Sequence, residues 1–151
     1  MKQLLLILFI IISSCSFAQV SFTGYFVDSD NGKLKDVEVN LFKGNEKIST
    51  KKWSKSFEYD LGLEMYYTLE LVKEGFISKR IAISTFEGDK GAEPFLFVME
   101  LIKNDDGIDG LDKDYPSALI KYKKDEGTFN FDVKYAKNIK KEEKEAKKKE
   151  K

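Results

Sequence analysis

The alternation of apolar and polar residues constrains the fold of this chain more than any other feature. Between residues 20 and 103 apolar side chains recur at every second position, a spacing that is typical of half-buried strands rather than helices. The groups that carry it are Phe22, Gly24 and Phe26; Val37, Val39 and Leu41; Phe57, Tyr59 and Leu61; Tyr67, Leu69 and Leu71; and Ile81 and Ile83. Residues 95–102 are apolar at both parities, which predicts a central or covered strand.

Turn-forming residues separate these groups at intervals of about 8 to 12 residues, a spacing typical of sandwiches and barrels. They are Asp30-Asn31-Gly32, Gly44-Asn45, Gly62, Glu74-Gly75 and Glu87-Gly88-Asp89. Gly supplies positive φ, and Asn and Asp side chains bond to their own backbone. The pattern predicts an all-β domain over residues 19–103, built as a seven-stranded antiparallel β-sandwich.

Residues 1–18 are arranged as a secretory signal peptide. Lys2 gives a positive start, residues 4–12 are apolar without a break, and a small, mostly polar segment follows. The apolar run is too short to span a bilayer. Because Ser16 and Ala18 stand where small residues precede a cleavage site, we expect cleavage after Ala18 and export to the periplasm or the medium.

Cys15 supports an alternative to simple export. Residues 12–15 read Ile-Ser-Ser-Cys and resemble a bacterial lipobox, in which Cys15 would be acylated and would anchor a lipoprotein. We favour simple export because an acceptable cleavage site follows within a few residues. Cys15 is the single cysteine of the chain, so cleavage after Ala18 would leave a mature protein without disulfides.

Three stretches of sequence resemble a known family. Residues 23–28 read Thr-Gly-Tyr-Phe-Val-Asp, residues 34–41 read Leu-Lys-Asp-Val-Glu-Val-Asn-Leu, and residues 67–76 read Tyr-Thr-Leu-Glu-Leu-Val-Lys-Glu-Gly-Phe. Together they resemble the carboxypeptidase regulatory-like domain. The resemblance implies a transthyretin-like sandwich, Ig-like in its general architecture, that serves as an accessory module and carries no catalytic residues of its own. Two family motifs are altered here: residues 33–37 replace Pro-Leu-x-Gly-Ala, and residues 54–57 replace Asp-Gly-x-Phe.

The last third of the chain divides into an Asp-rich linker (104–116), a β-hairpin (117–133) and a charged tail (134–151). Apolar alternation on both sides of Lys124-Asp125-Glu126-Gly127 predicts the hairpin. Its aromatic side chains would be costly to leave in water, so we expect it to dock on the sandwich, with a partner as the alternative. Asp132 is placed to cap a short helix, and we expect the Lys- and Glu-rich tail beyond it to be frayed helix or disordered.

Composition excludes several classes of function. The chain has no histidine, which rules out Ser-His-Asp triads and imidazole metal sites. Its 26 basic and 26 acidic residues balance, which argues against binding nucleic acid through bulk positive charge. Phosphate loops, dinucleotide fingerprints, nucleophile elbows and zinc motifs are missing from the sequence. We therefore predict no enzymatic activity, no cofactor and no nucleic-acid partner.

The sequence thus predicts an exported, non-catalytic module that scaffolds or binds a protein partner of the cell envelope. The candidate contacts are Phe129 and Phe131 on the hairpin and Trp53 and Tyr66 on the sandwich. The alternative is a carbohydrate-binding module, in which the rings of Trp53 and Tyr66 would stack on sugars. Packing in the core or at an edge is the competing role for these rings, because most large aromatic side chains are largely buried.

Four acidic residues of the linker are weak candidates for a calcium site: Asp105, Asp109, Asp112 and Asp114. Spaced carboxylates and glycines can wrap a calcium ion. The helix-loop-helix calcium pattern nevertheless fails, because counting from Asp105 puts Gly107 at the third position and Pro116 at the twelfth. We interpret the segment as a solvated linker.

This interpretation predicts that calcium leaves the melting temperature unchanged, because a ligand that does not bind the folded chain cannot stabilise it. Thermal unfolding with calcium or with a chelator measures this. A rise of several degrees with calcium that disappears in the double variant Asp109→Ala, Asp112→Ala would instead establish a calcium site in the linker.

Overall fold

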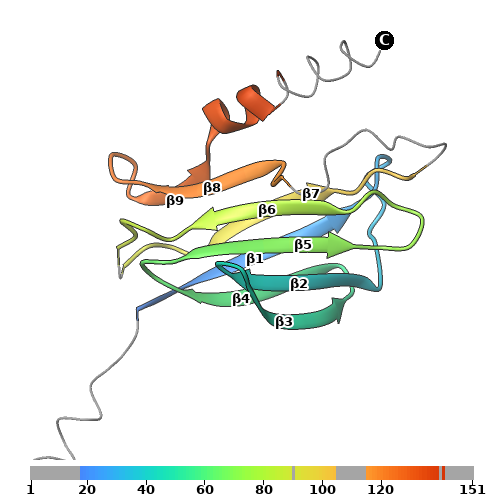
Figure 1. The fold of residues 1–151 in the computed structure, drawn as a ribbon, viewed down its shortest axis with the longest axis horizontal. Helices are drawn as coiled ribbons and strands as arrows, with labels where there is room; N and C mark the ends of the chain where they lie inside the picture. The colour runs from blue at the N-terminus through green and yellow to red at the C-terminus, as the bar shows by residue number, and fades with distance from the viewer. Residues whose placement is uncertain (1–17, 90, 105–114, 140, 142–151) are drawn as a thin grey trace, which may run out of the picture.

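The computed structural model describes residues 18–89, 91–104, 115–139 and 141. These residues form nine strands in two sheets that pack face to face (Figure 1). The small sheet has the strand order β4-β1-β7 and the large sheet the order β3-β2-β5-β6-β8-β9. The strands are β1 (Gln19–Val27), β2 (Val37–Lys43), β3 (Glu46–Trp53), β4 (Ser56–Gly62), β5 (Tyr66–Val72), β6 (Lys79–Ser84), β7 (Phe95–Glu100), β8 (Ala118–Lys123) and β9 (Thr128–Phe131).

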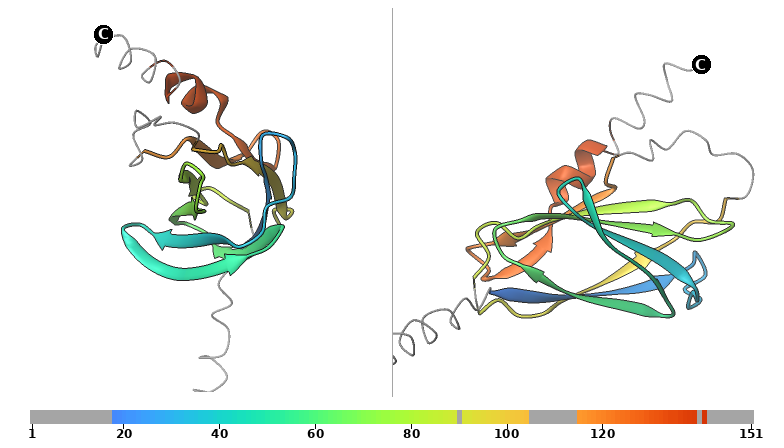
Figure 2. Two further views of the ribbon diagram at one scale, coloured as in Figure 1. Left: turned by 90° about the vertical axis from the view of Figure 1, so that its right-hand side faces the viewer. Right: turned by 60° about the horizontal axis from the view of Figure 1, so that its bottom comes forward.

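A short helix over residues 133–139 follows β9. The predicted all-β sandwich with a short C-terminal helix is therefore confirmed, and the two views of Figure 2 show its two layers. The predicted signal peptide, apart from Ala18, and residues 105–114 of the linker lie outside the described residues.

Both sheets are mixed, although alternation had predicted antiparallel pairing throughout. β7 lies parallel to β1, and β8 lies parallel to β6. Parallel neighbours need a long crossover connection, and here the chain leaves the large sheet after β6, adds β7 to the small sheet, and returns to the large sheet as β8. The sequence did not reveal this because alternation reports which face is buried and not the direction of a strand.

Aromatic rings fill the space between the sheets. Phe57 of β4 packs against Phe26 and Phe97, with ring centroids 5.4 and 5.8 Å away. Gly24 on β1 makes room for it, because a Cβ there would lie 2.4 Å from the Phe57 ring. Gly24 therefore acts as a hole in the inner face of the small sheet, and Phe57 fills it.

The prediction of a central or covered strand at residues 95–102 is wrong. β7 is an edge strand of the small sheet. Phe97 and Met99 face the core and are buried, whereas Leu96 and Val98 are 60% and 63% exposed. Apolar residues at both parities indicated two covered faces, but the described residues cover only one.

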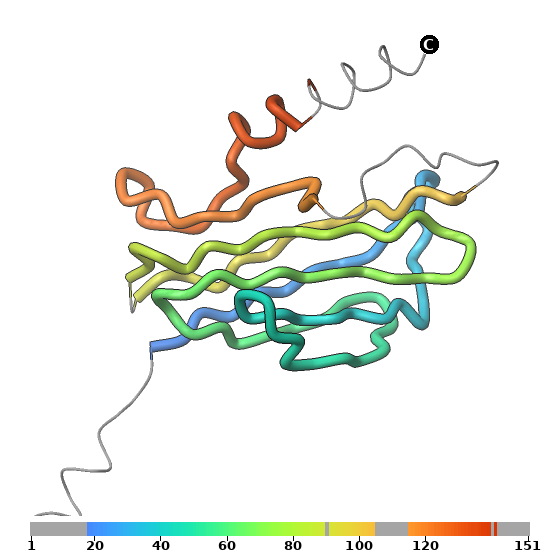
Figure 3. The backbone as a smooth tube through the Cα atoms, viewed as in Figure 1, coloured from blue at the N-terminus to red at the C-terminus, as the bar shows by residue number. Residues whose placement is uncertain are grey.

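The predicted docking of the hairpin on the same chain is confirmed. β8 extends the large sheet beyond β6, and β9 forms its outer edge (Figure 3). Phe129 is 1% exposed, and its ring meets that of Phe22 on β1 at 5.0 Å, edge to face. Phe131 contacts Phe95 and Phe97 of β7 at 5.9 and 6.1 Å. The hairpin is thus part of the sandwich and shares its core.

A polar ladder crosses the outer face of the large sheet. Thr50 of β3 donates to Asn40 Oδ1 of β2 at 2.7 Å, and Asn40 Nδ2 donates to Glu70 Oε2 of β5 at 3.1 Å. Glu70 in turn accepts from Arg80 of β6 through Nε at 2.9 Å and Nη2 at 2.7 Å. Neighbouring members of the ladder are paired in register. The ladder therefore fixes the alignment of four strands, because a slip of one residue would place these groups on opposite faces.

The contacts of Phe129 predict a large loss of stability on truncation. Phe129→Ala should lower the free energy of unfolding by about 3 to 5 kcal/mol, because it removes buried ring area and leaves a cavity beside Phe22. Urea unfolding measures this. The control Val133→Ala removes an exposed apolar side chain and should change the free energy of unfolding by no more than about 0.5 kcal/mol. Equal small effects of both variants would show that hairpin and sandwich do not share a core.

Candidate functional site

Trp53, one of the predicted contact residues, closes an edge of the sandwich. Its ring packs edge to face on Tyr59 of β4 at 6.0 Å, and Lys51 Nζ lies 5.8 Å from its centroid. Its Nε1 is buried and has no hydrogen-bond partner within the described part of the chain. The ring is only partly buried, and its packing matches the structural role that competed with sugar binding.

Tyr66 is the predicted contact residue that the structure leaves most exposed. It begins β5, is 60% exposed, and packs on Phe86 with centroids 4.7 Å apart. Phe86 was not among the predicted contact residues; it follows β6 in a turn. The two rings form a small aromatic surface.

Phe129 and Phe131 do not form a free contact surface. Phe129 is buried against Phe22, so it cannot touch a partner while the fold is intact. Phe131 is partly buried against β7. Among the described residues, no ring contact joins either residue to Trp53 or Tyr66. The structure therefore does not bring the four predicted residues together, and the two hairpin residues pack within the sandwich instead of forming a contact surface.

An apolar patch that sequence analysis missed lies on the outer face of the small sheet. Val98 is opposite Tyr25 on β1, and Leu96 is opposite Thr23. Tyr25, Leu96 and Val98 are all exposed. We call Tyr25, Leu96 and Val98 the outer patch. Alternation places Leu96 and Val98 on the opposite face from Phe97 and Met99, but because both sets are apolar it does not show which set faces outward.

Acidic side chains flank the outer patch. Glu58 on β4 is opposite Thr23 and accepts a hydrogen bond from Ser21 Oγ at 3.0 Å. Glu100 follows Val98 on the same face of β7. No Lys or Arg occurs at an outward position of β1, β4 or β7, the strands of this described sheet. The face is therefore apolar at its centre and negative around it.

The backbone edge of β7 beside the patch has no strand partner among the described residues. Leu101 N donates to Val27 O of β1 at 2.9 Å, so the odd-numbered residues of β7 direct their backbone groups toward β1. Leu96 and Val98 direct theirs away from it. The edge ends at Glu100, whose carbonyl accepts from Lys79 Nζ at 2.9 Å. Burial lowers the pKa of Lys79, and the nearby Glu100 carboxylate partly offsets that effect.

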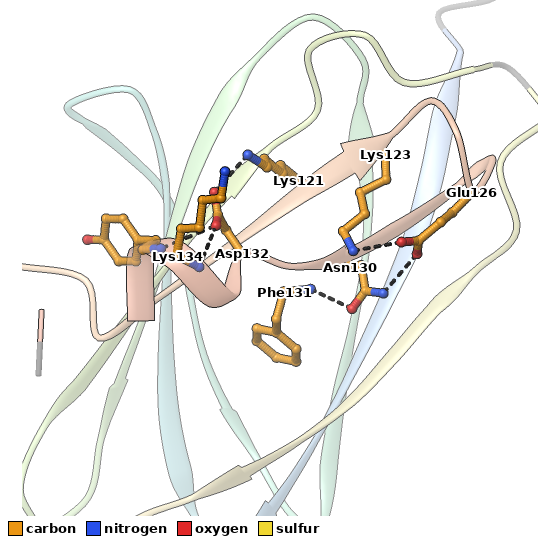
Figure 4. Close-up of polar contacts among 8 residues, drawn as sticks. Lys121, Lys123, Glu126, Asn130, Phe131, Asp132 and Lys134 are labelled. Carbon is orange, nitrogen blue, oxygen red and sulfur yellow. Dashed lines mark hydrogen bonds and ion pairs between the residues drawn. The ribbon is translucent and has the colours of Figure 1, made fainter. Parts of the chain in front are cut away.

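Polar contacts order the hairpin and the start of the helix (Figure 4). Asp132 Oδ1 accepts from the backbone N of Lys134 at 2.9 Å and of Tyr135 at 3.2 Å, which confirms the predicted helix cap. Asp132 Oδ2 pairs with Lys121 Nζ at 2.7 Å. The hydrogen bond from Lys121, followed by that from Tyr135 N, lowers the pKa of the Asp132 carboxyl.

The described residues contain no group of three or more acidic or cysteine side chains that could hold a metal. The predicted calcium candidates at positions 105, 109, 112 and 114 lie outside the described residues. In the same described part of the chain, no helix has the length and apolar character needed to cross a membrane.

Comparisons with known proteins give no family. No family model matches the chain, and no curated protein matches its sequence. The structure of S.CueP is similar with 14% identity and a TM-score of 0.43, over 56% of this chain and 62% of that one. Mercury-inhibited catechol 1,2-dioxygenase from Acinetobacter sp. ADP1 has 13% identity and a TM-score of 0.43, over 69% of this chain and 59% of that one. The chain spans less than two thirds of either protein, and neither similarity bears on its function.

The cap at Asp132 predicts an acid-dependent contribution to stability. Because the folded pKa of Asp132 is depressed, the ionised carboxylate stabilises the fold above its ordinary pKa, and this stabilisation is lost as pH falls through the folded pKa. Asp132→Ala should cost about 1 kcal/mol at neutral pH, whereas Asp132→Asn retains a capping oxygen and should cost less. Urea unfolding between pH 7 and pH 3 should show a smaller acid loss in Asp132→Asn than in the wild type. Identical pH profiles would contradict this role.

Proposed function

We propose that the protein is an exported, non-catalytic module that binds a protein partner of the cell envelope, and that it does so through the outer patch and the edge of β7 that no described strand covers. The observation that carries the proposal is the exposure of Leu96 and Val98 on an edge strand. Long apolar edge strands are normally shielded, because they template pairing with other chains. An unshielded one is a natural docking site.

The partner that fits this surface is an extended polypeptide segment. A strand added beside β7 would bond to the backbone of Leu96 and Val98, while their side chains and Tyr25 would receive its apolar residues. Pairing is limited beyond Glu100, because Ile102 O already accepts a backbone hydrogen bond from Ile77 N at 2.9 Å. Main-chain bonds would supply affinity, and the alternating side chains would supply specificity.

Charge determines the chemistry of that segment. Glu58 and Glu100 flank the patch, and the described strands β1, β4 and β7 contain no Lys or Arg; Lys79, from β6, lies at the Glu100 end of the edge. A segment with apolar residues at alternate positions and Lys or Arg around them would be complementary. A second copy of this chain is a poorer occupant, because it would bring the same carboxylates against themselves.

Residues 1–18 support export, and the resemblance of residues 23–28 and 67–76 to the carboxypeptidase regulatory-like domain supports an accessory role. The alternative of carbohydrate binding has one specific observation in its favour. Tyr66 and Phe86 present adjacent exposed rings, and such rings are the kind that could stack on sugars. The two functions use different surfaces, so variants separate them.

A pair of synthetic peptides tests the proposal. A nonapeptide of alternating Val and Lys should bind the protein and slow hydrogen exchange at the amides of Leu96 and Val98, whereas the alternating Val and Glu peptide should not. Binding should weaken with added salt, because it includes surface charge pairs. Equal binding of both peptides, or protection elsewhere, would refute the proposed surface.

Two variants complete the test. Leu96→Ser with Val98→Ser should abolish peptide binding with little change in stability, because both side chains are exposed. The control Val133→Ser alters an exposed apolar residue elsewhere and should bind as the wild type does. In a glycan array, binding that is lost in Tyr66→Ala and kept in the Leu96, Val98 variant would favour the carbohydrate alternative.

A further inference from the structure

A cleft of about 940 Å³ opens between the two sheets at the end where β1 begins and β4 ends. Its size falls within the ~300 to 1,000 Å³ range of small-molecule pockets. Leu41, Leu61 and Leu63 belong to its apolar lining, and Ile48 and Met65 are exposed beside them. We call it the end cleft. It contains no residue of the outer patch.

Tyr67 presents a hydroxyl group to the end cleft. The side chain is only 6% exposed and contributes to the lining. Its hydroxyl oxygen accepts from Gly62 N at 3.1 Å, but within the described residues its O–H has no acceptor. Buried hydroxyls normally donate as well as accept. This hydroxyl is suited to a ligand that carries an oxygen acceptor.

Charge at the end cleft favours a cation. Among the described residues, Asp60, Glu64 and Asp89 line it, against the ammonium of Lys43 and, after cleavage behind Ala18, the α-ammonium of Gln19. No salt bridge among the described residues engages these carboxylates. A cationic ligand would therefore meet an excess of negative charge that the described chain leaves unbalanced.

From these features we infer that the end cleft binds a small amphipathic amine that also carries an oxygen acceptor. An apolar amino-acid amide has all three parts: an alkyl group for the leucine-lined wall, an ammonium group for the carboxylates, and a carbonyl for the Tyr67 hydroxyl. A sugar fits less well, because the Tyr67 ring is buried and cannot stack. An organic anion would be repelled.

Two probes that differ only in charge test the inference. Leucinamide is a cation at neutral pH, and N-acetylleucinamide has the same alkyl group and carbonyl but no charge. Titration followed by amide NMR should show saturable shifts at Leu63, Met65 and Gly88 for leucinamide, and weaker binding of the acetylated probe. Equal binding of the two probes, or no saturable shifts at these residues, would overturn the inference.

Variants separate charge from hydrogen bonding. Glu64→Gln with Asp89→Asn should weaken leucinamide binding about fivefold, since exposed ion pairs contribute modestly, and should leave the acetylated probe unaffected. The matched control Glu74→Gln with Asp125→Asn removes the same charge at exposed positions outside the cleft and should bind as the wild type does. Tyr67→Phe should weaken both probes. An unchanged affinity for leucinamide in the cleft variant would contradict the inference even where the fold is intact.

Discussion

The contact between Phe22 and Phe129 is the interaction on which the architecture depends. Phe22 lies on β1, the central strand of the small sheet, and Phe129 lies on β9, the edge of the large sheet. Their edge-to-face packing joins segments that are far apart in sequence and closes one side of the sandwich. Because the chain has no disulfide to offer within its described part, aromatic packing of this kind replaces covalent closure.

The chain reaches this contact through mixed sheets. After β6 it adds β7 to the small sheet, parallel to β1, and then returns to the large sheet as β8, parallel to β6, so that β9 brings Phe129 beside Phe22. On the other side of β6, the ladder from Arg80 to Thr50 fixes the register of the antiparallel strands. The aromatic contact of Phe129 thus holds the β8–β9 side of the large sheet, and the polar ladder aligns the strands from β3 to β6.

Sequence reasoning was accurate where one face of a strand is buried and the other is polar. Alternation correctly predicted the buried faces of β1, with Phe22 and Phe26, and of β5, with Leu69 and Leu71. The position of Asp132 correctly predicted the helix cap. Sequence reasoning failed at β7, because the residues there are apolar on both faces, and alternation does not show that the described chain leaves the outer face of the small sheet uncovered. It also chose Phe129 as a contact residue, because an aromatic side chain is equally compatible with core and interface. Only the pairing of β8 with β6 distinguishes these roles.

Burial of the hairpin and exposure of the outer patch are two consequences of one arrangement. Phe131 packs on Phe95 and Phe97, so β9 shields the inward face of β7. It belongs to the other sheet, however, and leaves both the outward face and the backbone edge of β7 without a strand partner among the described residues. Leu96 and Val98 contribute little to the core from that position. The proposed docking of an extended segment would bury these two apolar side chains, which the described fold leaves exposed.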